Sequence, residues 1–298
     1  MHLRVALYYY SFCLLLLCST SISAQVFADE LDYRHSLNHI AVQEDSADKD
    51  TLSPLPFPLN SLKSQSAKTV QTVVNATTLT MGDNSIIRLD GILIPDQFTP
   101  SNQDNPIHTQ ALGLIKEHFT GKSVRAYYDR AMREPPKDRS EHLLAQLVSD
   151  KDNIWAQKLL LETGLAFYWP SETTSSIASH LQAYENVART GKVGLWANEE
   201  YAPKTPETVK ANSFQMQIVE GRPAKIATVR DMIYVNFGQN WREDFTVNIP
   251  QNLRKAFAKR RENPISWQGK LLRIRGFVED YNGPMIKIDS PEQIEIIE

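Results

Sequence analysis

Residues 69–92, TVQTVVNATTLTMGDNSIIRLDGI, contain three consecutive segments rich in residues that favour β-strands. Val70–Val74 and Thr78–Met81 have the composition and length of short strands. A third segment of this kind, Ser85–Ile92, follows a polar turn at Met81-Gly82-Asp83-Asn84. The pattern therefore predicts three strands in succession, joined by short connections.

The order of the elements after residue 92 narrows the fold class. Apolar residues at helical spacing predict a helix over 107–119 that ends at Gly121. Two strands and then two more helices are predicted after it, over residues 124–128, 143–148, 153–163 and 177–190. Three strands, a helix and two strands are the order of a five-stranded OB barrel, here with helices added at its C-terminal end.

The last third of the chain repeats this order without repeating the sequence. Strands are predicted over residues 214–229, 233–237, 245–249, 271–278 and 285–288. A short helix is predicted over 252–259, and Tyr281-Asn282-Gly283-Pro284 is a strong hairpin signal between the last two strands. The predicted fold class is therefore mainly β with helices (α+β), consisting of two OB-fold five-stranded β-barrels, of which the first carries the added helices.

The first 28 residues have the pattern of an export signal. Arg4 supplies a positive start, Val5–Leu17 is apolar, and Ser19–Ala28 is small and polar. The apolar run is shorter than the ~20 residues of an ordinary membrane-spanning helix. A buried core helix is the alternative interpretation. The signal predicts an exported protein, periplasmic or secreted.

The remaining chain divides by composition into four parts. Residues 29–66 mix Asp, Ser and Pro without a sustained period, which predicts a disordered arm or linker. The first barrel is expected over 67–200 and the second over 213–298. Prolines within 201–212 suit a connector between them.

Overall composition limits the possible functions. Of the 298 residues, 42% are hydrophobic and 22% charged, as in an ordinary globular protein. The formal net charge of −3 excludes a wholly basic nucleic-acid coat, so a polyanion site must be a local patch. Both cysteines, Cys13 and Cys18, lie in the predicted signal. Its removal would leave no disulfide, thiolate metal site or cysteine nucleophile.

Several segments between residues 69 and 198 resemble the staphylococcal nuclease (thermonuclease) family. Arg88-Leu89-Asp90-Gly91-Ile92-Leu93-Ile94-Pro95-Asp96 is similar to the family's stretch in which an arginine precedes two acids and a proline. Asp138-Arg139-Ser140-Glu141-His142-Leu143-Leu144-Ala145 resembles its Asp-Arg-Tyr-Gly-Arg-x-Leu-Ala segment. Trp155, Gly164-Leu165-Ala166, Glu185 and Gly194-Leu195-Trp196 are similar to its helical part. Residues 214–296 resemble an extra C-terminal module of some bacterial members.

The resemblance implies calcium-dependent hydrolysis of phosphodiester bonds in DNA or RNA. The family uses two metal-binding aspartates, a glutamate and two arginines for this chemistry. Carried across, the candidate catalytic residues are Arg88, Asp96 and His142, of which only Arg88 is unchanged. The two metal positions fall on Thr77 and Leu93, which offer no carboxylate. The resemblance therefore implies a degenerate site, with no calcium or other metal cofactor expected.

Each candidate catalytic residue also has a purely structural interpretation. Arg88 could pair with Asp90 on the same face of a strand, because side chains two residues apart point together. Asp96 beside Pro95 could start a turn. His142 could be a surface residue at the junction of a loop and a strand.

A second candidate site is a basic cluster in the C-terminal part. It consists of Arg254, Lys255, Lys259, Arg260 and Arg261, with Arg273, Arg275 and Lys287 on neighbouring predicted strands. OB barrels combine such cations with aromatic side chains to bind single-stranded nucleic acid. A solvated helix face is the alternative. Possible partners are therefore nucleic acid or another protein, with no membrane partner beyond the signal segment.

Two functions of different classes follow from these observations. The protein is predicted to be an exported, thermonuclease-like protein that is non-catalytic or weakly active and binds nucleic acid or protein. The alternative is an active nuclease that hydrolyses DNA or RNA. The fold does not distinguish them, because the residues of the site decide the chemistry.

Overall fold

The computed structural model describes residues 58–95, 105–240 and 242–298. The predicted export signal, residues 29–57 of the predicted arm, Asp96 and Trp241 lie outside these ranges. Residues 53–298 belong to one compact unit. Within the described ranges, no helix combines the length and the apolar character needed to cross a bilayer.

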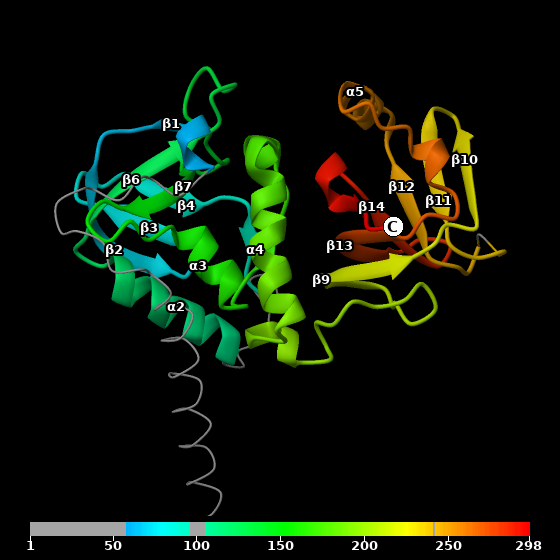
Figure 1. Ribbon diagram of the computed structural model, residues 1–298, viewed down its shortest axis with the longest axis horizontal. Coiled ribbons are helices and arrows are strands. Elements are labelled where there is room, and N and C mark those ends of the chain that lie inside the picture. The colour runs from blue at the N-terminus through cyan, green and yellow to red at the C-terminus, as the bar shows by residue number, and fades with distance from the viewer. Residues whose placement is uncertain (1–57, 96–104, 241) are drawn as a thin grey trace, which may run out of the picture. The chain divides into compact units, whose positions relative to one another are not determined.

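Six strands form the first sheet (Figure 1). They are β1 (Lys63–Ser64), β2 (Lys68–Asn75), β3 (Thr78–Met81), β4 (Ile86–Leu89), β6 (Ser123–Tyr128) and β7 (Leu143–Ser149). Pairing runs from β2 through β3, β4, β7 and β6 and returns to β2, so five strands form a closed barrel. Only β4 and β7 pair in parallel among these five. The predicted mainly β fold class with an OB-like barrel is therefore confirmed.

The three predicted helices are also present. They are α2 (Pro106–Phe119), α3 (Ala156–Glu162) and α4 (Ala178–Thr190). Helix α2 begins at a side-chain cap, because Asn105 accepts a hydrogen bond from the Ile107 N–H at 2.8 Å. Its residues Ala111, Ile115 and Phe119, four apart, are fully buried in the barrel core. Short 3₁₀ turns, Glu172–Ile177 before α4 and Gly194–Ala197 after it, complete this part.

Seven strands form the second sheet. They are β9 (Asn212–Gly221), β10 (Lys225–Val229), β11 (Met232–Asn236), β12 (Thr246–Ile249), β13 (Leu272–Asp280), β14 (Pro284–Lys287) and β15 (Ile294–Ile296). Pairing runs β10-β11-β12-β14-β13, and β13 also pairs with β9 and β15. The parallel pair β12–β14 corresponds to β4–β7, and the short helix α5 (Arg254–Lys259) precedes β13 as α2 precedes β6. The strand order of the first sheet is thus repeated.

The predicted second closed barrel is not confirmed. The sequence predicts one strand over residues 214–229, but β9 ends at Gly221 and β10 begins at Lys225. Pro223 lies in this gap and lacks the N–H that a central strand donates. Among the described residues, β9 and β10 are joined by the chain and not by a ladder of hydrogen bonds.

Three short segments differ from the sequence prediction. Residues 58–66 are not an arm, because Leu59 and Leu62 are buried in the barrel core and β1 pairs with β6. The predicted strand over 85–92 divides at Gly91, whose φ of +84° ends β4 and starts β5 (Ile92–Leu93). Strand β5 pairs with the unpredicted β8 (Phe167–Tyr168). The connector over 201–212 is packed, since Val209 lies in the core of the second sheet.

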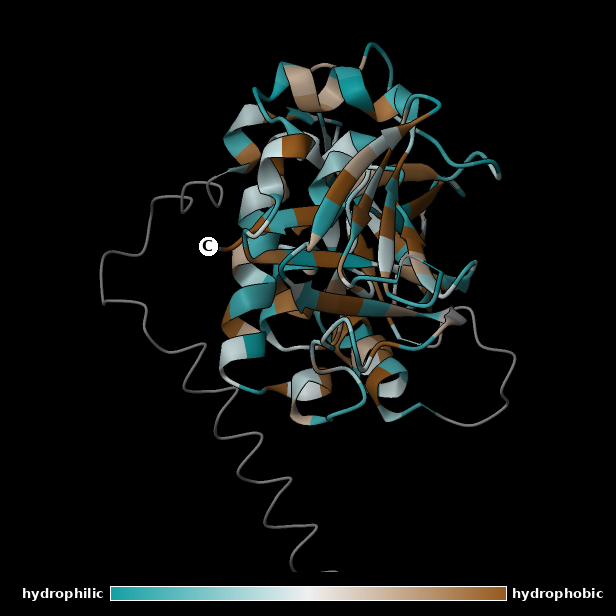
Figure 2. Cartoon of the chain, turned by 90° about the vertical axis from the view of Figure 1, so that its right-hand side faces the viewer, coloured by the Kyte–Doolittle hydropathy of each residue, from teal (hydrophilic) through white to brown (hydrophobic). Residues whose placement is uncertain are grey.

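Hydrophobic and hydrophilic residues alternate along several strands, which gives each sheet one buried face (Figure 2). The two sheets have separate cores. A third apolar cluster contains residues of both, namely Leu93, Phe167, Ala188, Leu195 and Trp196 together with Met216 and Ile218 of β9. We call it the shared cluster.

Candidate functional site

Two of the three predicted catalytic residues meet at one carboxylate. The parallel register of β4 and β7 pairs Arg88 with Leu144, which places His142 near Arg88 although 54 residues separate them. The Arg88 Nη1 lies 3.5 Å from Asp138 Oδ2, and the His142 Nδ1 lies 3.2 Å from the same oxygen. The third residue, Asp96, lies outside the described residues. The site is therefore an Arg88–Asp138–His142 cluster.

Asp138 organises this cluster through its other oxygen. The Asp138 Oδ1 accepts hydrogen bonds from the backbone N–H groups of Ser140 at 2.8 Å and His142 at 3.1 Å. Burial opposes the charge, but these N–H groups, His142 and Arg88 hold the pKa of the Asp138 carboxyl below its ordinary value. An ionised carboxylate thus orients the imidazole and the guanidinium. The sequence showed Asp138 within the family segment but gave no sign of this role.

A groove of about 880 Å³ adjoins His142. Its lining includes Gln65, Lys68, Asn84, Ser85, Glu134, Lys137, Glu141 and His142. Both lysines are paired: Lys68 Nζ lies 2.8 Å from Asp83 Oδ2, and Lys137 Nζ lies 2.8 Å from Glu141 Oε2. The Lys68 contact holds the pKa of Asp83 well below its ordinary value. Because each cation has an acidic neighbour, this groove has little net attraction for a polyanion.

The residues at the family's two metal-ligand positions, Thr77 and Leu93, are not suited to bind calcium. Thr77 is 3% exposed, and both its N–H and its hydroxyl bond to Asn75 Oδ1, at 2.9 and 3.1 Å. Leu93 is buried in the shared cluster. Calcium sites use several oxygen ligands, usually including carboxylates. The part of the chain that the structure describes contains no group of three or more His, Cys, Asp or Glu side chains placed to hold a metal.

Asp90 does not supply the missing carboxylate. Its oxygens accept hydrogen bonds from the Gly91 N–H at 2.9 Å, from Ser171 Oγ at 3.1 Å and from the Thr173 hydroxyl. Burial raises the pKa of the Asp90 carboxyl above its ordinary value. The suggested pairing of Arg88 with Asp90 is also not found, since the ion pair of Arg88 is with Asp138. Asp90 therefore fastens the turn at residues 171–174 to the barrel.

The basic cluster around α5 is present but partly neutralised. Arg254 lies 3.5 Å from Asp231, and Arg260 lies 3.0 Å from both Glu262 and Glu292. The other three cations, Lys255, Lys259 and Arg261, are exposed, and no ion pair joins them within the described ranges. We call these three the α5 cations.

Two of the three predicted neighbours of this cluster on the strands, Arg273 and Arg275, do not join it. Arg275 is 1% exposed and pairs with Glu185 and Glu295, while Arg273 pairs with Glu220 and Glu295. Interpreting these arginines as part of a nucleic-acid surface is therefore wrong. The sequence of a strand indicates which face of the sheet a side chain lies on. It does not indicate whether a carboxylate from another element pairs with that side chain.

The first barrel with its helices defines an OB-type domain that carries an Arg–Asp–His cluster. Residues 86–198 match the family described as staphylococcal nuclease homologue. The matched part runs from β4 to the turn after α4 and contains the motifs that resemble the family in the sequence. The match does not extend to the second sheet. A search of curated proteins found no match to the chain.

Proposed function

We propose that this protein is an exported nuclease-fold binding protein that attaches to nucleic acid without calcium-dependent cleavage. The observation that carries the proposal is the position of Leu93. A metal ligand of the family falls on this residue, whose side chain belongs to a buried apolar cluster and not to a polar site. The match to a nuclease family supports a nucleic-acid ligand.

The α5 cations are the proposed contact with the phosphate backbone. Lys255, Lys259 and Arg261 lie within seven residues of one another on an exposed segment. Cations of this kind bind phosphates by releasing counterions, and the affinity then falls as salt rises. Arg254 and Arg260 contribute less to phosphate binding, because each already forms an ion pair with a carboxylate.

A second candidate function is phosphodiester hydrolysis that does not use the family's metal positions. The Arg88–Asp138–His142 cluster favours it, because an oriented imidazole can move a proton and a guanidinium can stabilise the charge of a phosphate. We rank this second, since Arg88 and His142 both pair with the carboxylate of Asp138 and the lysines of the adjoining groove are paired with acidic side chains.

A nuclease assay distinguishes the two functions. The mature protein is incubated with single- and double-stranded DNA and RNA, with calcium or with a chelator, beside the Arg88→Ala variant. We expect no cleavage that depends on calcium. Calcium-dependent cleavage that Arg88→Ala abolishes would overturn the proposed function, whereas cleavage in chelator that Arg88→Ala and His142→Ala abolish would establish the second candidate.

Binding is measured by the fluorescence anisotropy of a labelled single-stranded oligonucleotide over a range of salt concentrations. Lys255→Ala/Lys259→Ala is expected to weaken binding and to reduce the slope of log K against log salt by about 1.4, since each phosphate contact to a single strand contributes about 0.7. The matched control is Lys116→Ala/Lys151→Ala, which removes the same charge from exposed positions of the first barrel. Equal effects of the two double variants would show that the α5 segment is not the interface.

A further inference from the structure

We infer that the C-terminal sheet is a permanent part of the nuclease domain, docked on the face that carries Leu93, so that the former metal position now serves an internal interface. The inference goes beyond nucleic-acid binding. The permanent docking of the C-terminal sheet is inferred from contacts alone. The role of Leu93 as a former metal position rests on the proposed function.

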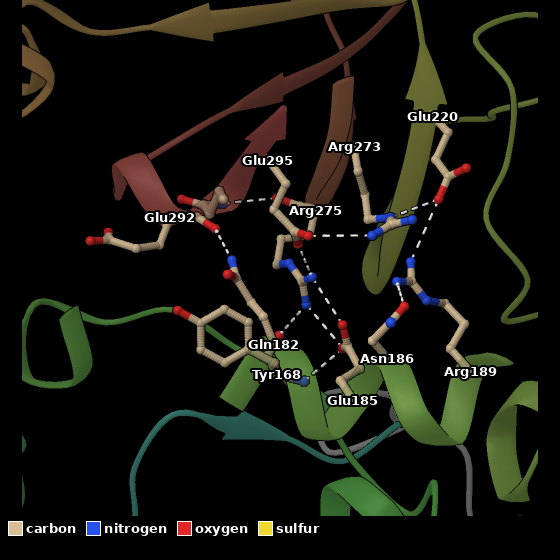
Figure 3. A network of polar contacts seen from close by, with 11 residues as sticks. Tyr168, Gln182, Glu185, Asn186, Arg189, Glu220, Arg273, Arg275, Glu292 and Glu295 are labelled. Carbon is tan, nitrogen blue, oxygen red and sulfur yellow. Dashed lines mark hydrogen bonds and ion pairs between the residues drawn. The ribbon is translucent and has the colours of Figure 1, made fainter. Parts of the chain in front are cut away.

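The first contact is a buried charge pair between the two sequence modules (Figure 3). Arg275 of β13 donates from Nη1 to Glu185 Oε1 and from Nη2 to Glu185 Oε2 of α4, both at 2.9 Å. Both side chains are 1% exposed. This two-bond arrangement fixes the orientation of the partners as well as their distance. A charged pair without water access requires that the two elements stay together.

Further contacts hold the guanidinium from other sides. Its Nη1 also donates to the backbone oxygen of Tyr168 at 2.8 Å, and its Nη2 donates to Glu295 Oε1 at 2.5 Å. The ring of Tyr168 lies 4.9 Å from the guanidinium carbon. Glu185 Oε1 in turn accepts the Tyr168 N–H at 2.8 Å. One arginine of the C-terminal sheet therefore satisfies both a side chain and the backbone of the nuclease domain.

A ring of weaker polar contacts surrounds this pair. Arg189 of α4 lies 3.5 Å from Glu220 of β9, and Ser175 donates to Glu292 at 2.9 Å. Gln182 donates to the backbone oxygen of Glu292 at 3.4 Å. Figure 3 shows two of these pairs, Gln182 with Glu292 and Arg189 with Glu220, on either side of Arg275. The contact therefore extends along α4 from residue 182 to residue 189.

The apolar half of the interface is the shared cluster. It includes Leu93 and Phe167, which are paired residues of β5 and β8, together with Met216 and Ile218 of β9. Trp169 also meets Phe277 with ring centroids 5.4 Å apart. Contacts between independent domains are usually more polar and permit relative motion. Here buried apolar residues of both modules form one cluster, which favours a single cooperative unit.

This arrangement makes a counterintuitive prediction for Leu93. In the family, an acidic residue at this position helps to bind calcium. Restoring it with Leu93→Asp would place a charge in the shared cluster, whose buried members among the described residues are all apolar and cannot pair with it. The substitution should therefore lower the melting temperature and should not create calcium binding.

The test measures thermal unfolding of the full mature chain with and without 5 mM calcium, for the wild type and Leu93→Asp. We expect Leu93→Asp to lower Tm by about 10 °C and calcium to restore none of it. Leu93→Met, which keeps the volume and the apolar character, is the control and should cost little. A calcium-specific rise in the Tm of Leu93→Asp would overturn the assignment of Leu93 to the interface.

A second measurement covers the case in which Leu93→Asp fails to fold. Amide hydrogen exchange is compared between the wild type and Arg275→Met, followed separately in peptides of α4 and of β13. If the modules form one unit, Arg275→Met speeds exchange in both elements by a similar factor. Faster exchange in β13 alone would overturn permanent docking. Neither readout uses cleavage or oligonucleotide binding, so the proposed function and this inference can fail separately.

Discussion

Arg88 and Arg275 both lie on strands and both meet a carboxylate, but their surroundings are opposite. The side chain of Arg88 is 38% exposed, and its Nη1 lies 3.5 Å from Asp138 Oδ2. Arg275 is 1% exposed and makes two bonds of 2.9 Å to Glu185. Burial works against the charge of Arg275, but Glu185 and Glu295 raise its pKa above the ordinary value.

The difference separates an arginine in a partly exposed ion pair from an arginine in a buried one. At Arg88, water can replace either partner, so loss of the pair costs little and the guanidinium is available to a phosphate. At Arg275, removal of either partner leaves the other charge buried without compensation. The family resemblance identifies Arg88 as a candidate functional residue. Arg275, in contrast, is expected to contribute more to the stability of the fold. The following changes test this contrast, from the largest expected effect to the smallest.

Glu185→Ala is expected to lower the free energy of unfolding by about 3–5 kcal/mol, because Arg275 would stay buried with only Glu295 beside it. Urea unfolding at pH 7 measures the change. Glu141→Ala, which breaks an exposed pair with Lys137, is the matched control and should change the stability by less than ~1 kcal/mol. Similar losses in both variants would remove the distinction between the two regions.

Asp138→Asn is expected to cost on the order of 1 kcal/mol at pH 7, since asparagine keeps one acceptor oxygen but loses the charge. The folded protein lowers the pKa of Asp138, so its charge contributes stability above the ordinary value of ~3.9 and loses this contribution as pH falls through the lower folded value. The difference between wild type and variant should therefore shrink below pH 4. Urea unfolding at pH 7 and pH 3 measures it, and a constant difference would contradict the role of the charge.

Arg88→Ala should change the free energy of unfolding by about 0–1 kcal/mol, as for other partly exposed ion pairs. If Arg88 instead stabilised the folded protein as a buried ion pair does, the loss of unfolding free energy would approach that of Glu185→Ala. Thermal and urea unfolding of the same preparation provide the comparison. The variant used as a control in the nuclease assay is thus expected to be fully folded.

Calcium is expected to have the smallest effect. A ligand that binds the folded state raises the melting temperature by mass action. With Thr77 and Leu93 at the metal positions, millimolar calcium should shift the Tm no more than magnesium at equal ionic strength. Differential scanning calorimetry with the two salts checks this. A shift specific to calcium, abolished by Asp96→Asn, would show that a site forms with residues outside the described ranges.

Much of the fold could be predicted because it depends on local patterns. The turn at residues 81–84 and the helical spacing over 107–119 are both found where expected. The prediction of strand boundaries failed where a single residue interrupts a β-strand pattern. Pro223 divides a predicted strand into β9 and β10, and Gly91 does the same to β4 and β5. Leu59 and Leu62 were missed because two apolar residues are too few to show a period.

The candidate site was only partly accessible to sequence reasoning. Motif order led to Arg88 and His142, which the structure brings together, but the organising role of Asp138 depends on a turn that no pattern specifies. Arg275 was assigned to a basic surface because its sequence neighbours are cationic. Its partner Glu185 is 90 positions away, and such a pairing depends on tertiary structure alone.

That separation along the chain also affects the order of folding. The buried contacts of Glu185 on α4 and of Leu93 on β5 cannot form until β9 and β13 have been made, because those strands supply their partners. Contacts between distant residues form slowly, since a long loop must close first. Until then Glu185 is a solvated carboxylate beside an uncovered apolar surface, which is the kind of surface that promotes aggregation. The buried contacts of α4 and β5 are therefore complete only when the last part of the chain is present and folded.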